Sequence, residues 1–163
     1  MNVKKMAITA LFIAIGVLSA HLIYIPILVS KCFPVQHAIN VILAVLLGTR
    51  YSVSAAFGIS LLRNLLGTGS ILAFPGSMIG AALAGYLYKK TQSIYGAILG
   101  EIIGTGVLGG LVAYPMAKFL LASNVGAFFF IAPFLVSTTG GSIIAYVILY
   151  ASPLKRAFYS FTK

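Results

Sequence analysis

The chain has 163 residues, of which 61% are hydrophobic and 7% are charged, and its mean hydropathy is +1.10. Because about a quarter of the residues in soluble domains are charged, this composition predicts an integral membrane protein and excludes a soluble enzyme. The net charge of +10 belongs to a chain with no soluble basic face, so we expect no nucleic-acid partner.

Apolar runs separated by charge, Pro or Gly predict an all-α protein of six transmembrane helices, in one domain covering residues 1–163. In chain order the segments are 6–29, 35–48, 52–66, 71–88, 94–117 and 126–150. The second and third are shorter than the roughly 20 residues that a perpendicular span needs, so we expect them to tilt or to stop part-way. An alternative merges 35–66 into one helix, which buries Arg50 and leaves five spans.

The positive charges distinguish these two topologies. Six spans with both termini in the cytoplasm place most cations on the inner side, namely Lys4, Lys5, Arg50, Lys89, Lys90, Lys155, Arg156 and Lys163. Five spans would put the Lys4–Lys5 pair on the opposite side from the later pairs, against the positive-inside rule. The sequence therefore predicts six spans in the cell membrane, with cytoplasmic N- and C-termini.

The first apolar segment also resembles a secretory signal peptide, because a basic pair precedes it. Cleavage after Ala20 would put the bulky Leu18 where a small residue is needed, and the apolar run continues to Val29. We therefore expect a retained first helix.

Small residues at helical spacing predict close helix packing. Two ladders are present, Gly96–Gly100–Gly104 and Gly76–Gly80–Ala84. On the first helix, a third stripe is formed by Ala7, Ala10 and Ala14. This stripe either packs inward or docks another membrane protein, and the residues alone leave both possibilities open.

Polar residues gather on the predicted outer side, in two stretches that contain Gly or Pro, 31–40 and 63–77. Irregular backbone at the membrane is tolerated only where it is buried in protein or lines a cavity, so we expect a pocket beneath these loops. Gln36, His37 and Asn40 share one helical face and could bind a small polar molecule. His37 alone could equally be a satisfied interfacial histidine.

Glu101 is the only acidic residue in the chain, and it lies within an apolar, glycine-rich segment. A lone carboxylate at membrane depth is costly, so it usually faces a partner, a cavity or a ligand. Two interpretations are open: Glu101 contacts a ligand, or it forms an interhelical ion pair with Arg63. Arg63 could also extend toward the membrane surface.

Enzymatic functions are poorly supported. Metal-dependent catalysis needs several carboxylates or a His/Asp set, and there is no P-loop for ATP hydrolysis. Cys32 is the only cysteine, which excludes an internal disulfide and a thiolate metal site. We therefore predict no catalytic residues, no metal and no cofactor.

Three stretches resemble the ThiW family over essentially the whole chain. They are KCFPVQHAIN at 31–40, RNLLGTG at 63–69 with AFPGSMIG at 73–80, and GEIIGTG at 100–106. The resemblance implies the six-helix fold of a substrate-binding S component of energy-coupling-factor (ECF) transporters, which takes up the thiazole moiety of thiamine. It also implies a transmembrane coupling subunit (T component) and two ATPase subunits as partners. In S components a small-residue pattern on the first helix docks the coupling subunit, and Ala10-x-x-x-Ala14, extended by Ala7, fits it.

The expected ligand is hydroxyethylthiazole, with thiamine and the thiazole phosphate as close alternatives. From polar clustering and predicted depth, the site residues are expected to be Phe33, Gln36, His37, Asn40, Arg63, Asn64, Phe74, Glu101 and Tyr114. A phosphate would favour Arg63 and Lys31 but would make Glu101 an awkward neighbour, which favours the neutral alcohol. Two other functions remain open: a solitary small-molecule channel or facilitator, and a membrane assembly subunit without a transport role.

Overall fold

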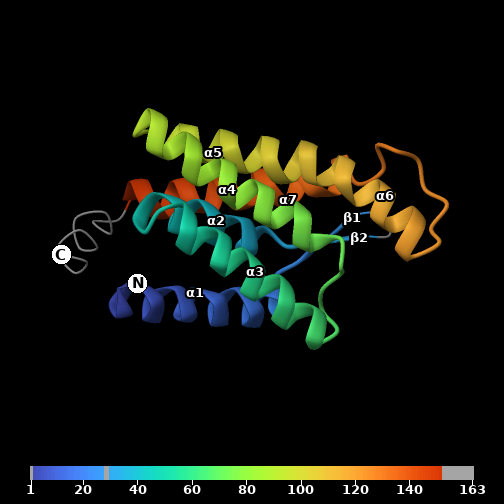
Figure 1. The fold of residues 1–163 in the computed structure, drawn as a ribbon, viewed down its shortest axis with the longest axis horizontal. Coiled ribbons are helices and arrows are strands. Elements are labelled where there is room, and N and C mark those ends of the chain that lie inside the picture. The colour runs from blue at the N-terminus through green and yellow to red at the C-terminus, as the bar shows by residue number, and fades with distance from the viewer. Residues whose placement is uncertain (1, 28–29, 152–163) are drawn as a thin grey trace.

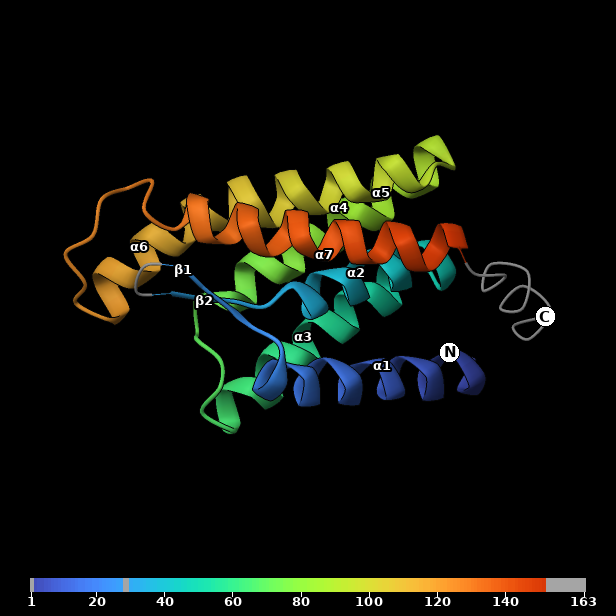
Figure 2. The same ribbon diagram turned by 180° about the vertical axis from the view of Figure 1, so that it is seen from behind.

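The computed structural model describes residues 2–27 and 30–151, which form six helical rods of alternating direction and one short hairpin (Figures 1 and 2). The elements are α1 (Val3–Leu22), β1 (Ile25–Ile27), β2 (Ser30–Cys32), α2 (Pro34–Leu46), α3 (Thr49–Leu65), α4 (Ala73–Thr91), α5 (Ile94–Glu101), η1 (Ile102–Gly109), α6 (Gly110–Leu120) and α7 (Ile131–Ala151). The six predicted helices are confirmed. Three rods are long and apolar enough to cross a membrane: α1, the continuous helix Ile94–Leu120, and α7.

The short helix α2 lies at the centre of the bundle. It packs against α1, α3, α4, α5 and α7, and every residue from Gln36 to Val45 is buried. Pro34 occupies its first turn, where the missing N–H costs nothing. The predicted shortness of the second and third helices is confirmed, since α2 has 13 residues and α3 has 17. Because other helices surround α2, protein rather than lipid covers its polar side chains.

The merged helix over 35–66 does not form. Gly48 separates α2 from α3 and has a φ of 91°, a left-handed conformation that side chains other than glycine rarely adopt. The chain reverses there, so α2 and α3 are antiparallel neighbours (Figure 1). The five-span alternative is therefore wrong.

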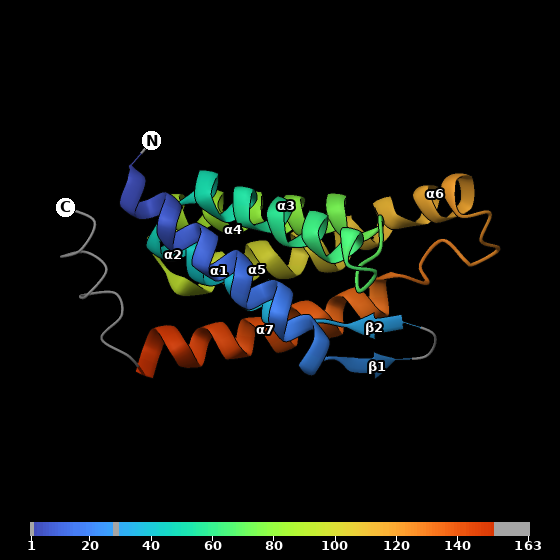
Figure 3. The same ribbon diagram turned by 90° about the horizontal axis from the view of Figure 1, so that it is seen from below.

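The first helix is shorter than predicted. Helix α1 ends at Leu22 rather than 29, and the chain continues into an antiparallel hairpin in which Ile25 pairs with Cys32. Pro26 cannot continue a helix, and the β-branched isoleucines around it favour a strand. Residues 28–29 lie outside the described residues. The hairpin extends beyond the end of α1, with β2 beside α7 (Figure 3). The last helix likewise begins at Ile131 rather than 126.

The two glycine ladders pack against each other, joining α4 to the long helix formed by α5, η1 and α6. A Cβ atom on Gly104 would lie 2.6 Å from the Cα of Gly80, and one on Gly109 would lie 2.5 Å from the Cα of Gly76. The middle of this helix is a π-helix, η1, a widened form that occurs frequently at functional sites. The two predicted close-packing seams thus form a single seam. Glu101 is the last residue of α5, directly before the widened helix η1.

Candidate functional site

A cavity of about 630 Å³ lies at the hairpin end of the bundle, opposite the start of α1. Its polar lining comes from all six helical rods, one strand and one loop, and comprises His21, Lys31, Gln36, His37, Arg63, Thr68, Ser70, Ser77, Thr105 and Ser137. Its aromatic lining comprises Tyr24, Phe33, Phe130 and Phe134. An aromatic cavity of this volume with a few polar groups is typical of a small-molecule site.

Arg63 is held in the wall of this cavity by neutral groups. Its side chain is buried, its Nη1 donates to Gln36 Oε1, and its Nη2 donates to the Thr68 carbonyl at 2.9 Å. The ring of Phe33 lies over the guanidinium, 3.6 Å from centroid to Cζ. This cation–π contact joins the start of α2 to the end of α3. Within the described part of the chain, Arg63 is therefore a buried cation that no carboxylate contacts.

Glu101 is completely buried, and its Oε1 atom accepts three hydrogen bonds. The donors are His37 Nδ1 at 2.8 Å, Asn40 Nδ2 at 3.1 Å and Thr105 Oγ1 at 3.0 Å. Among the described residues, His37 is the only basic side chain in contact with Glu101, and it is charged only when protonated, so the alternative of an Arg63–Glu101 pair is wrong. Arg63 instead binds Gln36, which comes from the neighbouring α2.

A second polar junction surrounds Ser77 on α4. Gln36 Nε2 donates to Ser77 Oγ at 2.9 Å and to Ser60 Oγ at 3.1 Å, while Asn40 Nδ2 approaches Ser77 Oγ at 3.2 Å. The same Asn40 nitrogen also contacts Glu101, so the two junctions form one network. This network links α2, α3, α4 and α5 directly beneath the cavity.

The nine predicted site residues fall into three groups. Four of them, Phe33, Gln36, His37 and Arg63, line the cavity. Two more, Asn40 and Glu101, lie behind it and bind residues that line it. The last three, Asn64, Phe74 and Tyr114, are not among the lining residues.

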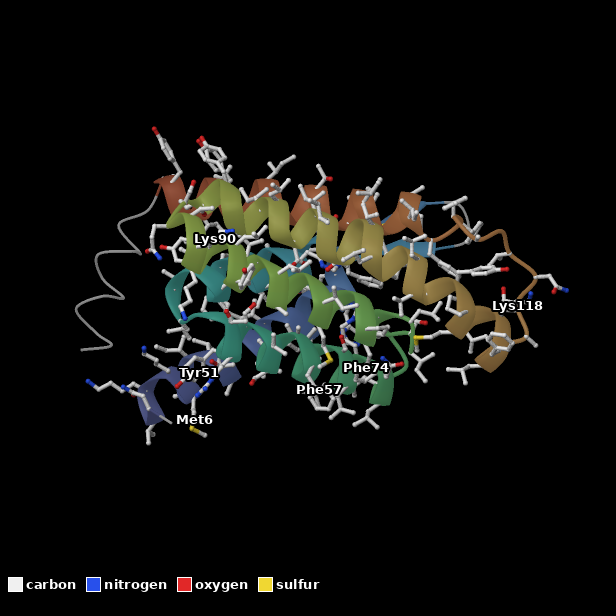
Figure 4. All side chains as sticks on the ribbon, turned by 45° about the horizontal axis from the view of Figure 1, so that its top comes forward. Met6, Tyr51, Phe57, Phe74, Lys90 and Lys118 are labelled. Atoms are coloured by element: carbon white, nitrogen blue, oxygen red, sulfur yellow. The ribbon has the colours of Figure 1, made fainter. Side chains whose placement is uncertain are left out.

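Each of these last three has a different local position. Asn64 Nδ2 donates to the carbonyls of Ser60 and Ser70, which fixes the turn after α3. Phe74 packs against Phe57 across the α3–α4 boundary, at 5.8 Å between centroids (Figure 4). Tyr114 is half-buried on α6.

Several lining residues were missed by sequence reasoning, chiefly Ser77, Thr105, Ser137, Phe130 and Phe134. Isolated serines and phenylalanines are ordinary in apolar helices, so nothing in the sequence marks them. Ser77 and Thr105 had a signal, because they lie in the stretches 63–77 and 100–106 that the sequence analysis identified.

The alanine stripe of α1 faces away from the bundle. Ala7, Ala10 and Ala14 are all exposed, whereas the buried side of α1 is formed by Thr9, Gly16, Val17 and Ala20. Of the two possibilities that the sequence left open, inward packing is therefore wrong.

An apolar helical bundle around a polar and aromatic cavity defines a multi-pass membrane protein of the small-molecule transporter class. More particularly, the chain belongs to the ThiW family: the family model described as thiamine-precursor transporter protein (ThiW) matches residues 6–155. Comparisons with curated proteins and with solved structures gave no match. The protein thus has a transport role within a family of thiamine-precursor transporters.

Proposed function

We propose that this protein is the S component of an ECF-type transporter and captures hydroxyethylthiazole for uptake. The observation that carries the proposal is the cavity lined by Phe33, His37 and Arg63 at one end of a ThiW-family bundle. A small aromatic alcohol needs an apolar surface for its ring and hydrogen-bonding groups for its hydroxyl and ring nitrogen. Both kinds of group are present in this lining.

The position of Glu101 bears on the charge of the ligand. Behind His37, the carboxylate is fully buried and does not line the cavity, so it would not repel an anionic ligand directly. The neutral alcohol remains our choice, because Arg63 Nη1 and Nη2 already donate to Gln36 and Thr68 and Phe33 covers the guanidinium, so only Nε lacks a partner among the described residues. A phosphate ester that bound both Nη atoms would have to compete with these contacts.

The exposed stripe on α1 supports the proposed role as an S component that docks a coupling subunit. Small side chains allow the backbones of two membrane helices to approach closely, so Ala7, Ala10 and Ala14 offer a docking surface for the coupling subunit. The energy for inward release would come from two ATPase subunits. With both termini in the cytoplasm, as this proposal holds, the cavity would open toward the outside.

The two alternatives differ from this proposal in affinity and in partners. A solitary facilitator would bind thiazole weakly and transport without ATPase subunits, and an assembly subunit would bind no vitamin-like ligand. Neither alternative accounts for both a polar cavity and an exposed small-residue stripe.

Thermal unfolding of the purified protein in detergent tests the proposal. Hydroxyethylthiazole at a hundred times its Kd should stabilise the folded state by about 2.7 kcal/mol. Thiamine, the pyrimidine precursor and an unrelated vitamin are tested separately at the same concentration. If none of the four compounds raised the melting temperature, capture would be refuted. A larger rise with thiamine than with hydroxyethylthiazole would reassign the ligand.

A further inference from the structure

The hydroxyl group of Ser77 already accepts two hydrogen bonds. Gln36 Nε2 and Asn40 Nδ2 both approach its oxygen, at 2.9 and 3.2 Å. A serine hydroxyl has two acceptor positions and one proton, so both acceptor positions are filled. In the described part of the chain no acceptor takes the remaining proton, although Ser77 lines the cavity.

The orientation of both amides is set by their other partners. Arg63 can only donate, so the Gln36 atom that it contacts is the carbonyl oxygen and the opposite atom is the nitrogen. Asn40 places its nitrogen against the Glu101 carboxylate, which can only accept. Both amides therefore donate to Ser77, and its proton is left to point at a ligand.

His37 offers a hydrogen-bond acceptor, whereas Ser77 offers a donor. Glu101 Oε1 accepts from Asn40 and Thr105 and acts as an acceptor toward His37 as well, so the proton of the imidazole is on Nδ1. In the neutral ring this leaves Nε2 as an acceptor. His37 lines the same cavity as Ser77, and Asn40 Nδ2 contacts both Ser77 and Glu101, the hydrogen-bond partner of His37.

We propose that Ser77 and His37 form a donor–acceptor pair that recognises a hydroxyl group of the captured ligand. Ser77 Oγ–H donates to the hydroxyl oxygen, and the hydroxyl proton is donated to His37 Nε2. Glu101 is a positioning residue, which acts on the ligand only by holding the tautomer of His37. This inference rests on the proposed capture of a thiazole alcohol and specifies which groups select it.

Three probes with the same ring separate the two hydrogen bonds in the unmodified protein. The first is hydroxyethylthiazole, whose side-chain hydroxyl both donates and accepts. The second is its O-methyl ether, whose side chain accepts but cannot donate. The third is 5-ethyl-4-methylthiazole, whose side chain does neither. We expect the ether to bind about tenfold more weakly than the alcohol, and the ethyl compound about tenfold more weakly again. Equal binding of all three would overturn the pair while leaving thiazole capture intact.

Variants then assign each hydrogen bond to its residue. Ser77→Ala should weaken the alcohol and the ether about tenfold each and leave the ethyl compound unchanged. Ser142→Ala is the matched control, because Ser142 is a buried serine whose hydroxyl has no partner among the described residues and which does not line the cavity. Ser77→Thr keeps the donor and should restore the wild-type order of affinities. An equal loss for all three probes in Ser77→Ala would show a structural role and overturn the assignment.

Glu101→Gln tests the positioning role. The amide of glutamine can donate to Nδ1, so His37 is no longer held with Nε2 as the acceptor. The alcohol should weaken at least tenfold to the level of the ether, while the ether and the ethyl compound keep their affinities. An unchanged preference for the alcohol over the ether would overturn the role of Glu101. Failure of all three probes to bind the wild-type protein would instead refute the proposed function itself.

Discussion

Helices α1 and α2 follow one another in the chain and are similarly apolar, yet they occupy opposite positions in the bundle. Four of the 20 residues in α1 are buried, compared with eleven of the 13 in α2. Helix α1 packs mainly on α3, where Gly16 is against Ile59, whereas α2 is enclosed by five other helices. Lipid or a partner must cover the exposed face of α1, while protein covers every face of α2.

The difference explains where polar side chains are tolerated. Gln36, His37 and Asn40 can be buried on α2 because each forms hydrogen bonds with residues on neighbouring helices. The exposed face of α1 carries only apolar and small side chains between Met6 and Leu18. The central helix therefore carries recognition, and the peripheral helix carries assembly under our proposal. The predictions below test that division.

The largest loss of stability is expected from Glu101→Leu. The change removes the only acceptor of His37 Nδ1 among the described residues, and it removes one of the acceptors of Asn40 Nδ2 and of Thr105 Oγ1. We expect a loss of about 3–5 kcal/mol in the free energy of unfolding, measured by denaturation in mixed micelles. Glu101→Gln is the control and should still fold and insert. A stable Glu101→Leu protein would show that the network around α2 is dispensable.

Gly80→Ala should be the next most damaging change. A Cβ atom at this position would overlap Thr105 Oγ1 and lie 2.8 Å from Glu101 Oε2, so α4 must move away from η1. We expect a loss of about 1–3 kcal/mol from overpacking. The control is Gly126→Ala, where a Cβ would meet nothing within 4 Å. Equal melting temperatures for the two variants would contradict the tight α4–η1 seam.

Phe33→Ala and Phe74→Ala separate the cavity lining from its surroundings. Phe33 lines the cavity and covers the guanidinium of Arg63, while Phe74 packs on Phe57 outside the lining. We expect Phe33→Ala to weaken thiazole binding roughly tenfold, because it removes an aromatic surface for the thiazole ring, worth about 0.5–1.5 kcal/mol, and frees Arg63 from its cation–π contact. Phe74→Ala should leave the Kd within about twofold. Calorimetric titration measures both, and the reverse order would relocate the site.

The smallest effect on stability is expected from Ala10→Leu and Ala14→Leu. Both residues are exposed, so the free energy of unfolding should change by no more than about 0.5 kcal/mol and ligand binding should persist. Co-purification with the coupling subunit should nevertheless be abolished, because leucine prevents close approach of the helices. The control is Ala151→Leu, because Ala151 is the exposed last residue of α7 and does not belong to the stripe. Retained co-purification in both variants would exclude this stripe as the docking surface.

By itself, the sequence determined the membrane class, the six helices and part of the lining of the cavity. Composition and apolar periodicity depend on local residue content, so they can be read without knowing which helices are neighbours. The polar residues of α2 were predicted as a group for the same reason, since their spacing on one helix fixes a shared face.

Only the tertiary structure decided the partners of those residues. It paired Glu101 with His37 rather than Arg63, brought Ser77 and Thr105 to the cavity, and left Phe74 and Tyr114 outside its lining. Each of these outcomes depends on how adjacent helices rotate and how closely they approach, which the glycine contacts between α4 and η1 set. The sequence shows that those glycines exist, but not which backbone each one faces, because helix packing joins residues that are distant in the chain.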